Sequence, residues 1–133
     1  MGKRPFLHLG LAMLFAGLML SACGPKKVSF DVELSDFKFT PGAFEVPTGA
    51  EVTLNLTNDA SVVHEFVVMK LGTQVSMPFD DNDEGNVFWE AEVEPGSAGT
   101  FTFTAPSEAG EYQLVCGTPG HLEAGMVGTF TVR

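Results

Sequence analysis

Residues 110–132 read GEYQLVCGTPGHLEAGMVGTFTV and carry the clearest indication of secondary structure in the chain. Polar and apolar side chains alternate from Glu111 to Cys116, which is typical of a β-strand with one face on a core. A second predicted strand begins at Met126 and runs to Val132. The loop between them contains glycine and proline. The stretch therefore predicts two consecutive strands joined by a compact loop.

The same alternation recurs after residue 27, with turn residues between the segments. The further predicted strands are Val28–Leu34, Phe37–Phe39, Glu51–Thr57, Val62–Val68, Val87–Val93 and Thr100–Thr104. Eight short strands at near-regular spacing indicate an all-β sandwich or a small barrel. Residues 71–86 are the least strand-like and predict a long excursion. The sequence shows no strong amphipathic helix, internal repeat or second domain.

Residues 1–22 have the pattern of a secretory signal peptide. A basic start at Lys3 and Arg4 precedes an uncharged apolar run over residues 6–20, and small residues follow. The run is short for a transmembrane helix, which needs about 20 apolar residues. The alternative is an uncleaved membrane anchor.

Residues 20–23, Leu-Ser-Ala-Cys, resemble the lipobox of bacterial lipoproteins. The resemblance implies cleavage before Cys23 and a diacylglyceryl group on its sulfur. Residues 23–27 would form a lipidated tether, and residues 28–133 the folded domain. We therefore expect an exported protein, lipid-anchored to a bacterial membrane and facing the periplasm or the cell exterior.

The predicted mature chain is strongly acidic. It keeps five basic and all 17 acidic residues, a formal charge of −12. Nucleic-acid binding needs a basic surface, so we expect no nucleic-acid partner. A basic partner protein fits this charge, although an exported domain also needs charge for solubility. Nothing in the sequence indicates an oligomer, and we expect a monomer.

Cys116, His121 and Met126 are each separated by four residues. Taken singly, they are an ordinary buried thiol, a loop histidine and a core methionine. Together they offer a thiolate, an imidazole and a thioether, a soft ligand set that favours copper. A type 1 copper site needs a second histidine. Because His8 leaves with the signal peptide, only His64 remains, and we predict one copper ion held by His64, Cys116, His121 and Met126.

Catalysis is not expected. The chain has no His-x-His pair, so the trinuclear centre of a multicopper oxidase cannot form. It also lacks a glycine-rich phosphate loop, and both histidines of the mature chain are committed to the metal.

The copper motif and its flanks, residues 110–116 with 119–121 and 124–128, resemble the cupredoxins, the plastocyanin and azurin family. They look most like auracyanin-type bacterial plastocyanin-like proteins. The resemblance implies an eight-stranded Greek-key β-sandwich that carries single electrons by Cu(I)/Cu(II) cycling between redox partners such as a cytochrome or an oxidase. His121 would be the electron port, surrounded by Pro119, Leu122 and Ala124.

Two residues depart from the family pattern. Glu65 follows the upstream histidine where many members have asparagine, and Gly117 follows the cysteine where many have threonine or serine. Both changes affect groups that hydrogen-bond around the metal ligands. A His-Glu-Phe-Val ligand strand also occurs in cupredoxins linked to copper tolerance. A copper-binding tolerance or delivery protein is therefore the alternative function.

The acidic loop and two methionines are further candidate sites. Residues 80–85 resemble the start of a calcium loop, but the twelfth position is Ala91, so a solvated acidic loop is the favoured interpretation. With nearby glutamates it could form a docking patch for a basic partner. Met69 and Met77 are interpreted as core residues in preference to auxiliary copper ligands.

Overall fold

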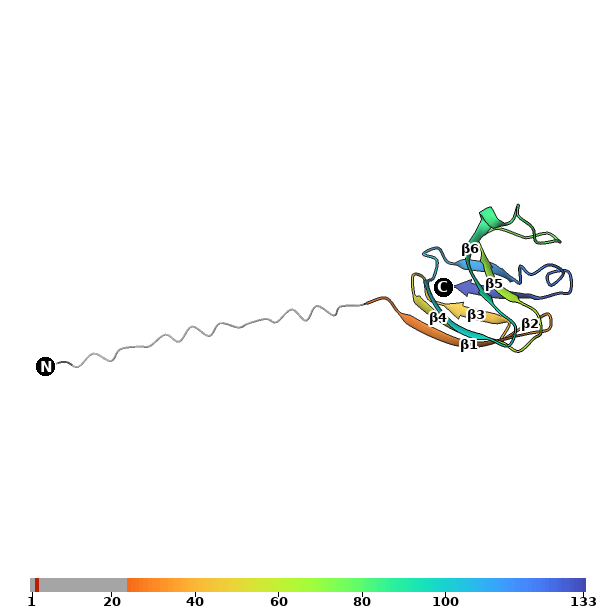
Figure 1. Ribbon diagram of the computed structural model, residues 1–133. Coiled ribbons are helices and arrows are strands. Elements are labelled where there is room, and N and C mark those ends of the chain that lie inside the picture. The colour runs from red at the N-terminus through yellow and green to blue at the C-terminus, as the bar shows by residue number, and fades with distance from the viewer. Residues whose placement is uncertain (1, 3–23) are drawn as a thin grey trace.

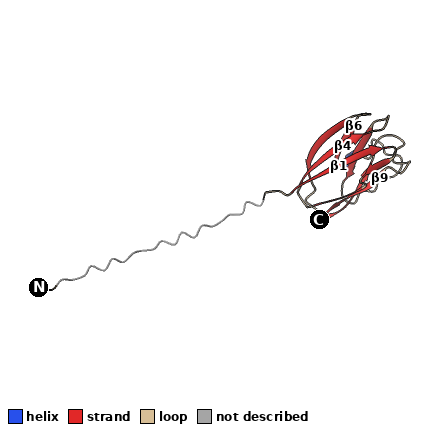
Figure 2. Ribbon diagram, turned by 90° about the horizontal axis from the view of Figure 1, so that it is seen from below, coloured by secondary structure: helices blue, strands red, loops and turns tan. Residues whose placement is uncertain are grey.

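The structure is a computed structural model that describes residue 2 and residues 24–133 (Figure 1). It is an all-β sandwich, as predicted (Figure 2). The only helical element among these residues is one short 3-10 turn, η1 (Glu84–Asn86). The strands are β1 (Lys27–Ser35), β2 (Lys38–Thr40), β3 (Ala43–Val46), β4 (Glu51–Asn58), β5 (His64–Met69), β6 (Val87–Val93), β7 (Ala98–Thr104), β8 (Gly110–Val115) and β9 (Val127–Val132).

The strands form two sheets. One has the order β2-β1-β4-β7 and the other the order β3-β9-β8-β5-β6. Most neighbours are antiparallel, but β1 pairs in parallel with β4, and β3 in parallel with β9. Non-consecutive strands are therefore neighbours in both sheets, and chain segments distant in sequence meet at the ends of the sandwich.

The alternation of apolar and polar residues in the sequence corresponds to alternating buried and exposed side chains in the structure. Val52, Leu54 and Leu56 of β4 have no exposed surface, whereas the residues between them are partly exposed. Aromatic rings fill much of the space between the sheets, and Trp89 stacks on Phe103 with ring centroids 4.2 Å apart. Burying each large apolar side chain in this way stabilises the folded state by about 1.5–3 kcal/mol relative to leaving it exposed to water.

The structure adds a ninth strand to the eight predicted. Phe44 and Val46 of β3 are buried and alternate with exposed residues, but four residues between two turns give a weak sequence signal. Some strand boundaries also differ by one or two residues. Phe37 lies in the turn before β2 with a φ of 58°, a left-handed conformation that is rare for a bulky residue.

Cys23, the predicted lipidation site, and the predicted signal peptide lie outside the described residues, apart from residue 2. No helix in the described part of the chain is long and apolar enough to cross a membrane. The first strand begins at Lys27, the last residue of the predicted tether.

Candidate metal centre

The sheet order brings the four predicted ligands to one end of the sandwich. β5 and β8 are antiparallel neighbours, with Val67 opposite Val115. Continued by one step, this register sets Cys116, the residue that follows β8, opposite Phe66, so that His64, the first residue of β5, lies two residues further along on the same face. His121 lies in the loop between β8 and β9, and Met126 immediately precedes β9.

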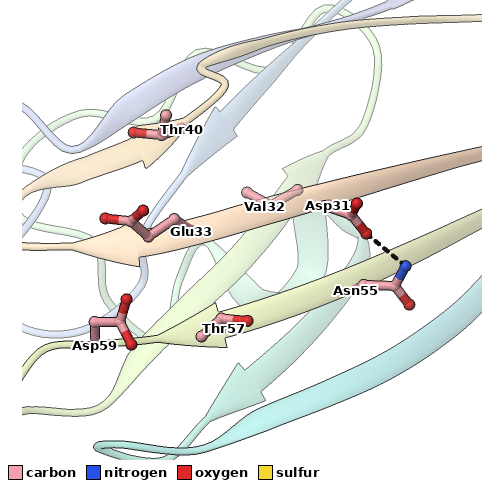
Figure 3. A pocket seen from close by; sticks show the side chains of 7 residues that line it. All are labelled: Asp31, Val32, Glu33, Thr40, Asn55, Thr57 and Asp59. Carbon is pink, nitrogen blue, oxygen red and sulfur yellow. Dashed lines mark hydrogen bonds between the residues drawn. The ribbon is translucent and has the colours of Figure 1, made fainter.

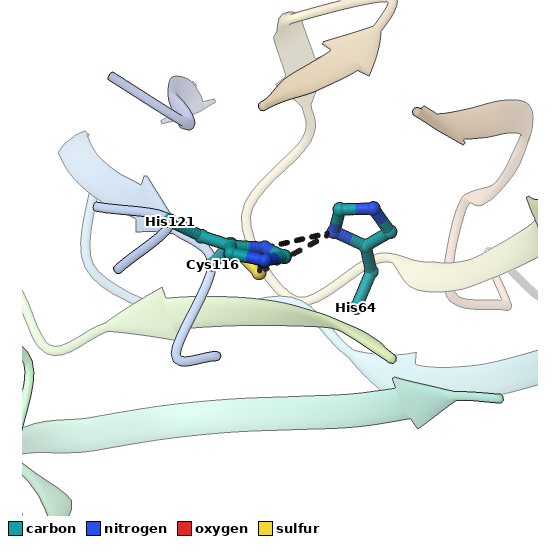
Figure 4. Close-up of side chains that lie close together, drawn as sticks. All are labelled: His64, Cys116 and His121. Carbon is teal, nitrogen blue, oxygen red and sulfur yellow. Dashed lines mark hydrogen bonds between the residues drawn. The ribbon is translucent and has the colours of Figure 1, made fainter. Parts of the chain in front are cut away.

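Three ligand atoms converge on one point (Figure 4). Nδ1 of His64 lies 3.1 Å from Nδ1 of His121, and the sulfur of Cys116 lies 3.4 Å from the His121 nitrogen and 3.8 Å from the His64 nitrogen. A point in the plane of this triangle lies about 2.0 Å from all three atoms, close to the usual lengths of metal–nitrogen and metal–sulfur bonds, about 2.0–2.3 Å. The side chains are therefore already spaced to hold one metal ion.

Burial favours the uncharged form of the two imidazoles. His64 has no exposed surface and His121 is 6% exposed. Burial lowers the pKa of both rings, the nearby His121 lowers that of His64 further, and Asp36 partly opposes the shift in each. Neutral nitrogens facing a sulfur present three electron pairs to one point, which is what a soft transition metal requires.

Met126 is fully buried in the same core cluster as Cys116. Its backbone N–H donates to the carbonyl of His121 at 2.9 Å, and its carbonyl accepts from the N–H of Cys116 at 3.1 Å. Gly120 and Gly125 have φ values of 86° and 92°, which glycine adopts without steric cost. These bonds and turns close the loop and bring the methionine back beside the cysteine.

The backbone next to His64 also contacts the cysteine. The N–H of Glu65 donates to the sulfur of Cys116 at 3.4 Å. The donor is the backbone N–H of residue 65, which is present whatever the side chain at this position. Glutamate in place of asparagine therefore keeps the hydrogen bond to sulfur.

Two residues that fix the ligands were not singled out from the sequence. Asn58 is fully buried, and its amide nitrogen donates to the carbonyls of Val62 and Val93 at 2.8 and 2.9 Å. Thr118 donates from its hydroxyl to the carbonyl of Val63 at 3.1 Å. Asn58 therefore shapes the segment that leads to His64, and Thr118 joins that segment to the cysteine loop. In the sequence, the only signal for these roles is that Asn58 and Thr118 lie within a few residues of His64 and Cys116.

Nε2 of His64 is buried and has no hydrogen-bond partner among the described residues. Since Nδ1 faces the other two ligands, Nε2 carries the ring proton when Nδ1 binds a metal. Metal-binding histidines usually donate this proton to a neighbouring group. The orientation of the His64 ring therefore depends on packing and on the metal.

Outside the metal centre, a surface pocket of about 400 Å³ lies over β1, β2 and β4 (Figure 3). It is lined mainly by polar and acidic side chains, including Asp31, whose carboxylate accepts a hydrogen bond from Asn55. No predicted ligand lines it.

The acidic loop is exposed around residues 80–82. Met69 is fully buried, as predicted, but Met77 is 64% exposed and is not a core residue.

A β-sandwich with a buried His-Cys-His cluster and a buried methionine on the same loop defines a type 1 copper protein. A family model described as a cupredoxin-like domain matches residues 9–132. The chain therefore belongs to the cupredoxin family, and the sequence resemblance is confirmed.

The relatives fall into two groups. The chain is 34% identical over 114 residues to the copper-resistant cuproprotein CopI of Rubrivivax gelatinosus, covering 77% of this chain and 64% of that protein. It is 28% identical over 110 residues to auracyanin-B of Chloroflexus aurantiacus, covering 71% of this chain and 46% of that protein. The crystal structure of dithionite-reduced auracyanin from the photosynthetic bacterium Roseiflexus castenholzii matches with a TM-score of 0.69 and 27% identity, covering 83% of this chain and 99% of that one. The chain thus spans less than two thirds of either sequence relative.

Proposed function

We propose that this protein carries single electrons between redox partners and catalyses no reaction of its own. When bound, copper supplies the redox couple, gaining one electron as Cu(II) and losing it as Cu(I). The role of the protein is to hold the ligands still during both steps. Support comes from the fold, the donor set and the similarity to an auracyanin crystallised in its reduced state.

The observation that carries the proposal is the spacing of the three donor atoms. They lie at bonding distance from one central point, and their side chains are almost completely buried. Strands β5 and β8 and the hydrogen-bonded loop fix their positions. A site held in this way needs little rearrangement when the charge on the metal changes, and this favours rapid electron exchange.

His121 is proposed as the port through which electrons pass. It retains slight exposure, and the ring of Phe37 packs edge-on against it with centroids 5.3 Å apart. Phe37 is itself 48% exposed, and Pro119 and Ala124 are exposed on the same loop as the histidine. Leu122, which we expected at this surface, is instead buried against Val67 and Val115.

The partners and location follow from sequence features. We propose redox proteins such as a cytochrome or an oxidase as partners, with a basic docking face that complements the acidic chain. We further propose that the protein is a monomer, exported and anchored to a bacterial membrane through lipid on Cys23, facing the periplasm or the exterior.

The second candidate is a copper-tolerance or delivery protein on the same fold. It is favoured by the 34% identity to a copper-resistant cuproprotein. The two candidates differ in what leaves the protein: a carrier releases electrons and keeps copper in both oxidation states, whereas a delivery protein releases Cu(I) to an acceptor.

One variant pair separates them. Ala124→Lys places a charge beside His121 without touching a ligand, and Ala109→Lys makes the same change at an exposed position near the other end of β8. The six residues of that strand span about 20 Å. Stopped-flow reduction by a soluble cytochrome and competition with a Cu(I) chelator are measured on both variants and on the wild type.

The carrier proposal predicts slower reduction in Ala124→Lys only, with Cu(I) retained in all three proteins. Slow reduction of the wild type together with loss of Cu(I) to the chelator would overturn it in favour of delivery. Equal slowing in both variants would show that His121 is not the port.

A further inference from the structure

Glu65 and Gly117, the two departures from the family pattern, meet in the structure. The register of β5 and β8 pairs Val67 with Val115, and its continuation sets Glu65 opposite Gly117. A Cβ added to Gly117 would overlap Oε2 of Glu65 and lie 3.3 Å from its Cδ. The carboxylate of Glu65 therefore lies against the backbone that follows Cys116.

A side chain at position 117 is disfavoured by the observed position of the Glu65 carboxylate, the end of a flexible side chain, and not by the backbone. The φ of Gly117 is outside the left-handed region, whereas Gly120 and Gly125 on the same loop are within it. Apart from those of Glu65, the nearest atom of another residue to an added Cβ would be Cε1 of Phe79 at 3.2 Å, which a small ring movement relieves. A side chain at position 117 and the observed position of Glu65 are thus mutually exclusive.

The carboxylate is surrounded by other acidic groups. Glu65 lines a cavity of about 200 Å³ with Glu84, Glu90 and Glu92, and Glu92 is its cross-strand partner. No ion pair or side-chain hydrogen bond to the Glu65 carboxylate occurs among the described residues. Burial and the charges of Glu92, Glu90 and Glu84 raise the pKa of the Glu65 carboxyl. No cation among the described residues neutralises the carboxylate when it is ionised, so its charge then acts on the adjacent metal centre.

We propose that Glu65 is a positioning and tuning residue of the copper centre, accommodated by Gly117, and that its charge lowers the reduction potential. Reduction removes one positive charge from the metal, so a nearby carboxylate stabilises the oxidised state more than the reduced state. The inference concerns the copper site itself and holds for a carrier and for a delivery protein alike, so its failure is separable from failure of the proposed function.

The charge is tested with Glu65→Gln, which keeps the shape of the side chain and the backbone N–H that donates to Cys116. The matched control is Glu92→Gln, which removes a charge from an exposed position in the same cluster. Voltammetry of the copper proteins should show a higher potential in Glu65→Gln, a smaller rise in Glu92→Gln, and an unchanged visible band in both. An unchanged or lower potential in Glu65→Gln, or equal rises in the two variants, would overturn the tuning role.

The fit between the two residues is tested without the metal. Gly117→Ala should lower the midpoint of thermal unfolding of the copper-free protein, and adding Glu65→Ala should recover much of that loss, because the overlapping carboxylate is gone. The same pair should shift and then restore the visible band of the copper protein. If Gly117→Ala does not fold, recovery of folding in the double variant gives the same answer. Additive losses in the double variant, or a Gly117→Ala protein identical to wild type, would overturn the matched fit.

Discussion

Met126 offers the weakest donor of the ligand set, because a thioether binds copper less strongly than a thiolate or an imidazole. Met126→Leu conserves volume in a fully buried position and should cost less than about 1.5 kcal/mol of the free energy of unfolding. Copper should stay bound, and the reduction potential should rise, because a donor that favours Cu(II) is replaced by hydrocarbon. Voltammetry and metal analysis check both outcomes, and an unchanged or lower potential would mean that the Met126 thioether does not donate to copper.

Glu90 lies beside Glu84 and Glu92, and burial followed by these charges raises its pKa above the ordinary value of 4.5. A raised pKa in the folded state means that the folded protein binds protons more readily than the unfolded chain. The corresponding stability is present below pH 4.5 and is lost as the pH rises through the folded-state pKa.

Glu90→Gln removes this repulsion. The midpoint of thermal unfolding of the copper-free protein should therefore rise at pH 7–8, and the gain should shrink towards pH 4. Asp31→Asn is the comparison, because that carboxylate lies in the other sheet and accepts a hydrogen bond from Asn55. A gain from Glu90→Gln that is equal at both pH values would contradict repulsion within the cluster.

Asn58, the last residue of β4, holds the segment that leads to His64. Asn58→Ala removes both donor bonds to backbone carbonyls and the bond that its oxygen accepts from the N–H of Ala60. Leaving buried backbone groups unpaired should cost about 2–4 kcal/mol of the free energy of unfolding. The copper band should also broaden as His64 loses its fixed position.

Asn55 is the matched comparison on the same strand. It is partly exposed, and its hydrogen bonds lie on the outer face of the sheet. Asn55→Ala should cost less than about 1 kcal/mol and leave the band unchanged. Denaturant unfolding and visible spectroscopy measure both variants, and equal losses would contradict a special role for Asn58.

The sequence predicted those strands whose two faces differ. In β4, one face is buried and the other partly exposed, and the alternation makes this visible. β3 was missed because four residues between turn signals carry too little pattern, and its place depends on parallel pairing with β9, more than 80 residues away. Such pairing follows from the three-dimensional packing of the chain.

The ligands could be predicted because a soft donor set has a recognisable composition and spacing. The residues that hold the ligands in place could not be predicted from the sequence. Asn58 has the sequence context of a turn residue, Thr118 that of an ordinary loop residue, and Leu122 that of a surface residue beside His121. Their hydrogen bonds and burial depend on segments distant in sequence. The close approach of Glu65 to Gly117 is likewise visible only when β5 and β8 lie side by side.

At the scale of the whole molecule, we expect that a lipid on Cys23 anchors the protein to the membrane. In cells, the wild-type protein should remain on membranes after a salt wash. Cys23→Ser should give soluble or uncleaved protein with no lipid mass on residue 23. Cys116→Ser, which removes the other cysteine, should leave attachment unchanged. Membrane fractionation with mass spectrometry decides this, and release of the wild type by salt alone would contradict the anchor.

The central claim is that one buried site binds one copper ion and cycles it without losing it. Titrating the copper-free protein with Cu(II) should produce an intense visible thiolate-to-copper band that saturates at one equivalent, with a narrow copper hyperfine splitting in EPR. The band should disappear on reduction with dithionite in the presence of a Cu(I) chelator and return fully on reoxidation, and it should be absent from Cys116→Ser. A colourless wild-type protein with stoichiometric Cu(II), or a band that fails to return because the chelator has removed the metal, would contradict the account.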